Sequence, residues 1–279
     1  MTRKPQPDEV SPTNHNQKPP SRAVIAGRVR GAGHERTGQP CQDFYFYQWD
    51  RDWAVACLAD GAGSARFAHI GARRAVFAAG TLAVNALRRG TTDLTQCTKD
   101  ALAAARLALE QQPAPISDYA CTLLLVVQQG DRLATAQIGD GWIVLLRGQS
   151  SKAAHLPSRG QYVNQTNFLT QTTWCSHVQY QNHEQLPALN GFALLSDGLE
   201  RATISLQDAT PSHTFFNGLY GWLTKAETTP KQAKKALLTF LNSDRVRETS
   251  DDDKSMVLIT RCHSGEATEP IPSKLVQPC

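Results

Sequence analysis

The order of predicted elements indicates an α+β fold in which packed antiparallel β-sheets are covered by α-helices. Short segments rich in β-branched and aromatic residues recur along the chain, as expected for strands. The helical segments are grouped between runs of strands and do not alternate with them. Regular alternation would instead favour a parallel sheet.

Eight segments have the length and composition of strands, and several are bounded by Asp, Gly or Asn turn residues. The run from 121 to 147 reads as strands joined by hairpins. The predicted strands span 23–29, 43–49, 53–59, 121–128, 132–138, 142–147, 191–196 and 255–260.

Three segments have helical patterns. Residues 65–87 repeat apolar residues and alanines every three to four positions, and residues 94–111 are rich in Ala and Leu with few breakers. Residues 230–241 begin with a proline, which is favoured in the first turn of a helix.

Composition predicts one domain between two tails. Residues 1–22 are rich in Pro, Asn, Gln and charge and predict a disordered tail, and residues 263–279 predict a loose Pro-rich tail. The remaining 23–262, in a chain of 279 residues with 41% hydrophobic content, can build one large core.

Charge and cysteine content predict a cytoplasmic protein that binds neither nucleic acid nor membrane. The net charge of +4 is small and scattered, so nucleic-acid binding is not expected. Seven cysteines without C-x-x-C spacing favour free thiols in a reducing compartment. No apolar run is long enough for a membrane span or a signal peptide.

Five aspartates share one context, because each lies at the start or end of a predicted strand. Each alone has a simpler explanation: the Asp140-Gly141 step is typical of a tight hairpin turn, Asp197 can cap a helix, and 251–253 can be a solvated charge run. The five are Asp43, Asp60, Asp140, Asp197 and Asp252.

Together the aspartates predict a metal site. Strand ends at one edge of packed sheets converge, and gathered carboxylates repel each other unless cations neutralise them. Oxygen ligands without sulfur or imidazole favour Mg²⁺ or Mn²⁺. Two such ions about 4 Å apart activate water for phosphoester hydrolysis.

The segments CQD, ADGAGSA, IGDG, SDGLE and SDDDKSMVLI, in this order, resemble the protein phosphatase 2C family of metal-dependent serine/threonine phosphatases. The resemblance spans roughly residues 27–260, and GAGHERTGQPCQD and YVNQTNF are most similar to a bacterial sub-branch. It implies a four-layer αββα sandwich with a two-metal site at one end, and a flap-like insertion at about 147–186 beside that site.

The resemblance also implies roles for individual residues. Asp60 would bridge two Mn²⁺ or Mg²⁺ ions with the Gly61 carbonyl as a further ligand, and Asp197 and Asp252 would bind the second ion. Asp43 would orient a metal-bound water, and Asp140 would recruit a third, weaker ion. In the flap, Asn164, Thr166 and Phe168 are candidates for structure or substrate contact.

Three positions depart from the family pattern. Ala62 stands where many members have a histidine that acts as general acid. The phosphate-binding arginine is displaced, which leaves Arg36 or His34 for that role. The last motif reads Asp-Asp-Lys-Ser instead of Asp-Asn-x-Thr, so Asp252 is aligned to the ligand, with Asp251 and Asp253 as register alternatives.

The predicted function is hydrolysis of phosphoserine or phosphothreonine in proteins by a metal-bridging hydroxide, with Asp43, Asp60, Asp197 and Asp252 as the catalytic set. The expected partner is a phosphorylated protein and a cognate kinase that the enzyme opposes. Two alternatives are a pseudophosphatase that binds phosphoproteins without turnover and a two-metal phosphodiesterase or nuclease.

Overall fold

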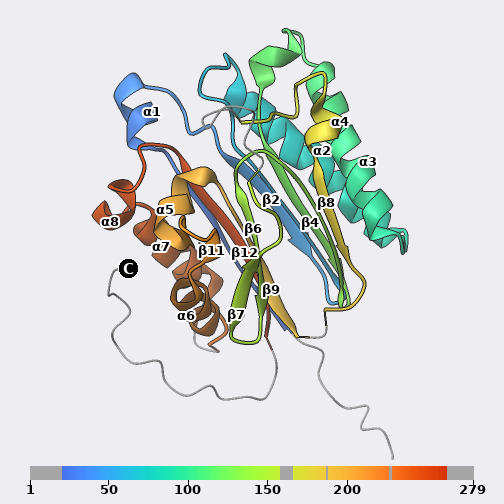
Figure 1. The fold of residues 1–279 in the computed structure, drawn as a ribbon, viewed down its shortest axis with the longest axis vertical. Coiled ribbons are helices and arrows are strands. Elements are labelled where there is room, and N and C mark those ends of the chain that lie inside the picture. Colours follow the sequence, from blue (N-terminus) through green and yellow to red (C-terminus); the bar gives the residue numbers. More distant parts are fainter. Residues whose placement is uncertain (1–20, 158–165, 187, 226–227, 263–279) are drawn as a thin grey trace, which may run out of the picture.

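A computed structural model describes residues 21–157, 166–186, 188–225 and 228–262. The predicted N- and C-terminal tails lie outside these residues, apart from positions 21 and 22, as does Asn164 of the predicted flap. Within the described chain, two five-stranded antiparallel sheets stack face to face and helices cover both outer faces (Figure 1). This is the predicted α+β sandwich.

The first sheet has the order β1-β12-β9-β6-β7, so both the beginning and the end of the described chain lie in it. Its central strands are apolar on both faces because helices cover one face and the second sheet covers the other. The strands are β1 (Ser21–Val29), β6 (Trp142–Arg147), β7 (Ser150–Ala153), β9 (Leu189–Leu195) and β12 (Lys254–Cys262).

The second sheet has the order β2-β3-β4-β5-β8. Every residue of its strand β3 is buried, with Val55 and Cys57 facing the helices and Ala54 and Leu58 facing the first sheet. The strands are β2 (Phe44–Trp49), β3 (Trp53–Ala59), β4 (Leu123–Gln129), β5 (Arg132–Ile138) and β8 (Gln179–His183).

Helices α2 (Ala68–Arg88) and α3 (Leu94–Glu110) cover the second sheet, and α6 (His213–Leu223) and α7 (Pro230–Leu241) cover the first (Figure 1). Helix α7 begins with the expected proline, after a capping box between Thr229 and Gln232. The shorter elements are α1 (Ala32–Thr37), α4 (Trp174–His177), α5 (Glu200–Thr203), α8 (Asp244–Arg247), the 3₁₀ turns Ile116–Tyr119 and Asp197–Leu199, and the hairpin of β10 (Ile204–Ser205) and β11 (Thr210–Pro211).

Three apolar layers hold these parts together: one under each pair of helices and one between the two sheets. The middle layer includes Leu58 and Leu124 of the second sheet and Phe192 and Val257 of the first, each at most 1% exposed. Burial of this apolar surface fixes the stacking of the sheets. It therefore also fixes which strand ends meet at the edge of the sandwich.

All eight predicted strands and all three predicted helices are present. One prediction was wrong: Asp140-Gly141 is no hairpin turn, because β5 and β6 belong to different sheets and the chain crosses between them at this point. The crossing needs a glycine at Gly139 for two reasons. Its φ is 110°, and a Cβ at this position would lie only 2.4 Å from the Thr122 side chain.

Two further features concern the helices and the cysteines. In the described ranges, no helix is both long and apolar enough to cross a bilayer. Five cysteines are free thiols: Cys41, Cys57, Cys97, Cys121 and Cys175.

Candidate active site

Strand ends from both sheets meet at one edge of the sandwich. In the second sheet, Phe44 pairs with Ala59, so the residues just before β2 and just after β3 are neighbours. In the first sheet, Leu195 pairs with both Trp142 and Met256, which brings together the end of β9 and the starts of β6 and β12. The five predicted aspartates occupy these ends.

Three of these aspartates form a compact cluster. Asp60, Asp197 and Asp252 each offer a carboxylate oxygen, and these oxygens lie within 4.8 Å of one another. Asp60 and Asp197 are partly buried, whereas Asp252 lies at the exposed rim. Asp60 follows β3, Asp197 follows β9 and Asp252 precedes β12, so the stacking of the sheets creates the cluster, and no single segment does.

Asp60 is held in place by its backbone. Its amide donates to the Thr122 hydroxyl at 2.9 Å, and its carbonyl accepts from the Thr122 amide at 2.8 Å. The next residue, Gly61, forms a bridge with Cys121. The carboxylate therefore projects from a fixed point at the end of β3.

Asp43 lies behind the cluster and is completely buried. The Arg28 side chain holds its turn by donating to the Asp43 carbonyl at 2.5 Å and to the Cys41 carbonyl at 3.3 Å. The Ser196 and Ser255 hydroxyls lie close enough to favour its ionised form, yet neither carboxylate oxygen makes a regular hydrogen bond. A buried carboxylate in this state indicates a missing cationic or hydrogen-bonding partner.

Burial and mutual repulsion raise the pKa values of the gathered carboxyl groups. Burial, followed by the charge of Asp253, raises the pKa of Asp43 to about 7. Burial, followed by Asp140 and Asp252, raises the pKa of Asp197 to about 7. The pKa of Asp60 is raised well above its usual value. Burial has the largest effect, followed by the charges of Asp43, Asp197, Asp252 and Asp140.

Asp252 is exposed as a residue, but the protein atoms around its carboxyl group still raise its pKa. Each of these carboxyl groups therefore ionises less readily than the carboxyl group of a solvent-exposed aspartate. A bound dication would reverse this preference, since it favours the ionised form.

Asp140, at the crossing between the sheets, is partly buried. The Thr166 hydroxyl donates a short hydrogen bond to its Oδ2. A residue of the predicted flap is therefore tied to the predicted third-ion ligand.

The three consecutive aspartates before β12 have different environments. Asp251 is 65% exposed and pairs with Arg36 at 2.7 Å. Asp253 is 1% exposed and accepts from the amides of Gly31 at 2.7 Å and Gln42 at 2.5 Å. Only the middle one, Asp252, points its carboxylate to Asp60 and Asp197.

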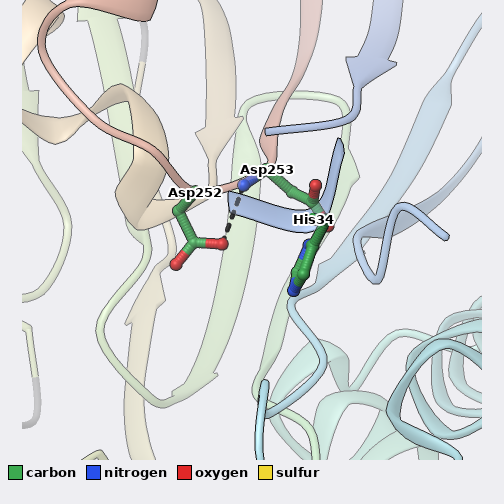
Figure 2. A group of neighbouring side chains, drawn as sticks. All are labelled: His34, Asp252 and Asp253. Atoms are coloured by element: carbon green, nitrogen blue, oxygen red, sulfur yellow. Dashed lines mark hydrogen bonds and ion pairs between the residues drawn. The ribbon is translucent and has the colours of Figure 1, made fainter. Parts of the chain in front are cut away.

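The two predicted phosphate-binding residues also differ. His34 is 13% exposed, and its Nδ1 lies 2.9 Å from Asp253 Oδ2, an ion-pair distance without the geometry of a regular hydrogen bond. Figure 2 shows the His34 ring and the Asp252 carboxylate on the same side of the loop, and a nitrogen of His34 lies within 4.8 Å of a carboxylate oxygen of Asp252. Arg36, in contrast, is 64% exposed and bound to Asp251.

The sequence reasoning missed several residues that support the site. Thr122 and Arg28 anchor Asp60 and Asp43, and Lys254 is buried beneath the Asp252 loop. Asp253, which the sequence offered only as a register alternative to Asp252, holds the start of α1. A charged residue such as Lys254 at the start of a strand with an apolar centre is a signal that could have identified it, because such a residue is costly to bury without partners.

The residues fit hard divalent cations. The clustered donors are carboxylate oxygens, Asp43 has both oxygens buried without a regular hydrogen bond, and Oδ1 of Asp197 is likewise buried without a partner. Oxygen-only sets of this kind favour Mg²⁺ or Mn²⁺ over softer metals.

Comparisons with known proteins agree with the fold. Residues 30–242 match the family model described as protein phosphatase 2C. The chain is 29% identical over 248 residues to serine/threonine-protein phosphatase 3 of Escherichia coli (strain K12), covering 85% of this chain and 97% of that protein.

Solved structures share the fold at low sequence identity. The Mycobacterium tuberculosis serine/threonine phosphatase PstP/Ppp superposes with a TM-score of 0.57 at 14% identity, covering 86% of this chain and 98% of that one. The catalytic domain of the serine/threonine protein phosphatase PstP in complex with two manganese ions gives a TM-score of 0.53 at 18% identity, covering 86% and 99% of the two chains.

Proposed function

The chain belongs to the protein phosphatase 2C family, and on this premise we propose that it hydrolyses phosphoserine and phosphothreonine in proteins with two Mn²⁺ or Mg²⁺ ions. The observation that supports the proposal most strongly is the convergence of Asp60, Asp197 and Asp252 within 4.8 Å. The similarity to a bacterial serine/threonine-protein phosphatase and to a manganese-bound relative supports the substrate class and the metal.

In this proposal Asp60, Asp197 and Asp252 would hold the ions, and the Gly61 carbonyl would be a further ligand. When bound, the ions supply an activated water and neutralise the charge of the phosphoryl group. Asp43 accepts a hydrogen bond from a water in the site, because its buried oxygens have no other regular donor. Asp140 provides a third, weaker cation position.

His34 is favoured over Arg36 for contact with the phosphoryl group. The His34 ring lies beside Asp252 and is held by the buried Asp253, so its position is fixed relative to the cluster. Arg36 is already engaged by Asp251 at the surface. Since Ala62 offers no acid, the proton for the leaving serine or threonine oxygen comes from water or from another side chain of the site.

The partner is a phosphorylated protein. The flap-like insertion at about 147–186 is proposed to contribute to its recognition, although β7 and β8, which lie within this range, are edge strands of the two sheets. The second proposed partner is a cognate kinase, whose phosphorylated products the enzyme dephosphorylates. The proposed compartment is the cytoplasm.

The test is turnover of a phosphothreonine peptide and of p-nitrophenyl phosphate with Mn²⁺, measured against cleavage of an oligonucleotide under the same conditions. Mn²⁺-dependent phosphate release, absent in EDTA, with no oligonucleotide cleavage is the expected result. Oligonucleotide cleavage alone would instead indicate a phosphodiesterase.

Phosphopeptide binding without release of phosphate would indicate a pseudophosphatase. Asp60→Asn provides the matched control, because it removes one carboxylate charge without changing the size of the side chain. If wild type and this variant released phosphate equally, the site assignment would be overturned.

A further inference from the structure

Lys254 is the first residue of β12 and is 1% exposed, so it is one of the largest fully buried side chains in the described chain. Lysine is rarely buried to this degree unless its ammonium group has partners. Its position two residues after Asp252 places it directly beneath the loop that delivers this aspartate to the site.

The ammonium group of Lys254 turns back to its own loop. It donates to the Ser250 carbonyl at 2.7 Å and to the Asp252 carbonyl at 2.8 Å. Both bonds join a charged donor to a backbone acceptor, the stronger class of hydrogen bond. Together they fix the backbone on both sides of Asp251 and hold the Asp252 carbonyl on the side of the buried lysine.

The stem of the same side chain lies against the neighbouring turn. A Cβ built on Gly198 would lie 3.3 Å from Lys254 Cγ and 1.9 Å from the Asp253 carbonyl oxygen. Gly198 follows Asp197, so the turn of Asp197 packs on the loop of Asp252 at the point where Lys254 passes. One side chain thus contacts the supports of two clustered aspartates.

We propose that Lys254 is a positioning residue that holds the Asp252 loop in its ligating shape before a cation binds. The proposal rests on the proposed function, since it concerns the same metal site. Ordering a flexible loop costs conformational entropy, and a loop that is already ordered binds its ion more tightly.

A simple charge effect predicts the opposite outcome. A lysine near two dications repels them, so removal of its charge alone would strengthen Mn²⁺ binding. Loss of the two backbone contacts would weaken Mn²⁺ binding instead, by roughly tenfold, as is typical for residues that support metal ligands. The direction of the change therefore separates positioning from charge.

The first measurement is isothermal titration of Mn²⁺ into wild type, Lys254→Met and Lys234→Met. Methionine keeps a straight stem but removes the donors, and Lys234 is an exposed lysine of α7 that provides the same change in charge away from the site. We expect roughly tenfold weaker binding for Lys254→Met only. Equal or tighter binding in Lys254→Met, or a lower thermal midpoint with unchanged Mn²⁺ affinity, would overturn the proposal.

The second measurement needs no variant and applies even if Lys254→Met fails to fold. Hydrogen exchange of the wild-type amides at 250–253 is recorded in EDTA and in Mn²⁺. Slow exchange in EDTA is expected, because the loop is preformed. Rapid exchange in EDTA that slows only with Mn²⁺ would overturn the role of Lys254, whereas failure of wild type to bind Mn²⁺ at all would overturn the proposed function itself.

Discussion

At the scale of single residues, the surroundings of the aspartates in the site disfavour their ionised form. Asp43, Asp60 and Asp197 combine burial with neighbouring negative charge, and both effects favour the neutral acid. A fold that only needed these positions filled would be more stable with neutral side chains. Dications would offset the repulsion between the carboxylates. The site can therefore be tested by changes of pH and by substitution.

The pH dependence of stability follows from the sign of these shifts. Asp43 and Asp197 have pKa values of about 7 in the folded state, above the value of about 4 expected in the unfolded chain. Between these values the folded state binds more protons, so the stability of the metal-free protein falls as pH rises from about 4 to about 7. Thermal unfolding in EDTA across this window should show a falling midpoint.

Added Mn²⁺ favours the ionised carboxylates, so its stabilising effect should grow as pH rises over the same window. The matched experiment is the same series of scans with Mn²⁺ in place of EDTA. A midpoint that stays constant with pH in EDTA, or an equal Mn²⁺ effect at every pH, would argue against buried ionisable ligands.

Substitution of a clustered aspartate should separate function from stability. Asp60→Asn and Asp197→Asn each remove a charge that repels its neighbours, so the metal-free variants should unfold at urea concentrations no lower than wild type. Turnover should fall by roughly 100-fold or more, since loss of even a supporting residue costs ~10–100-fold. Phosphopeptide kinetics in Mn²⁺ and urea unfolding in EDTA give the two readouts.

Asp251→Asn is the matched control for these variants. Asp251 is a neighbour of Asp252 in sequence but pairs with Arg36 at the surface, so turnover should stay within a few-fold of wild type. If Asp251→Asn were as damaging as Asp60→Asn, the assignment of Asp252 to the cluster would be in error by one position.

His34 and Arg36 should differ in their effect on the reaction. A hydrogen bond to a charged phosphoryl group contributes about 1.5–3 kcal/mol, so His34→Ala should lower kcat/KM by roughly 10- to 100-fold. Arg36→Ala breaks an exposed ion pair of about 0–1 kcal/mol and should change kcat/KM less than about fivefold. A larger loss in Arg36→Ala than in His34→Ala would reverse the proposed roles.

At the scale of elements, the site depends on close approach of the turn after β9 to the loop before β12. Gly198→Ala would place a methyl carbon 1.9 Å from the Asp253 carbonyl oxygen, and a backbone atom cannot rotate away. Overpacking of this kind costs about 1–3 kcal/mol. We expect a lower urea midpoint in EDTA and weaker Mn²⁺ binding by titration.

Gly63→Ala is the control for this substitution, because a Cβ at Gly63 meets no atom within 4 Å and the residue lies in the loop after Asp60. It should behave like wild type in both measurements. Equal behaviour of Gly198→Ala and Gly63→Ala would show that the two turns can separate without damage to the site.

The same elements show what the sequence could predict. Strands such as β3 and β4 were predictable because they are apolar on both faces, and α3 because of its Ala and Leu content. β7 and β8 were not, since SSKA and QYQNH lack strand patterning and are ordered by pairing with β6 and β5. Helix α6 contains two glycines and several aromatics, and its packing on the first sheet overrides this weak propensity.

The candidate site was predictable in composition but not in detail. The placement of five aspartates at strand ends was readable from the sequence, and the structure brings three of them together. The separate environments of Asp251, Asp252 and Asp253 were not readable, because they depend on contacts with α1 more than 200 residues earlier in the chain. The hydrogen bond of Thr166 to Asp140 was not readable either, because it joins the segment between β7 and α4 to the crossing between β5 and β6.

At the scale of the whole molecule, the stacking of the two sheets brings the ends of several strands together at one edge of the sandwich. Its two sheets are held face to face by the apolar layer between them, and this stacking aligns the ends of β3, β9 and β12. The site therefore lies between two halves that are joined by apolar packing and by polar contacts such as the Arg22–Gln128 hydrogen bond and the Arg261–Asp131 ion pair. Cation binding at the edge should link them further, so the Mn²⁺ site and the stability of the sandwich are coupled.

The most direct test of the metal site is the anomalous diffraction of crystals grown with Mn²⁺. Two strong manganese peaks are expected, with Asp60 bound to both and Asp197 and Asp252 bound to one. Absence of manganese peaks at this cluster at millimolar Mn²⁺, or peaks bound only by residues elsewhere, would contradict this expectation.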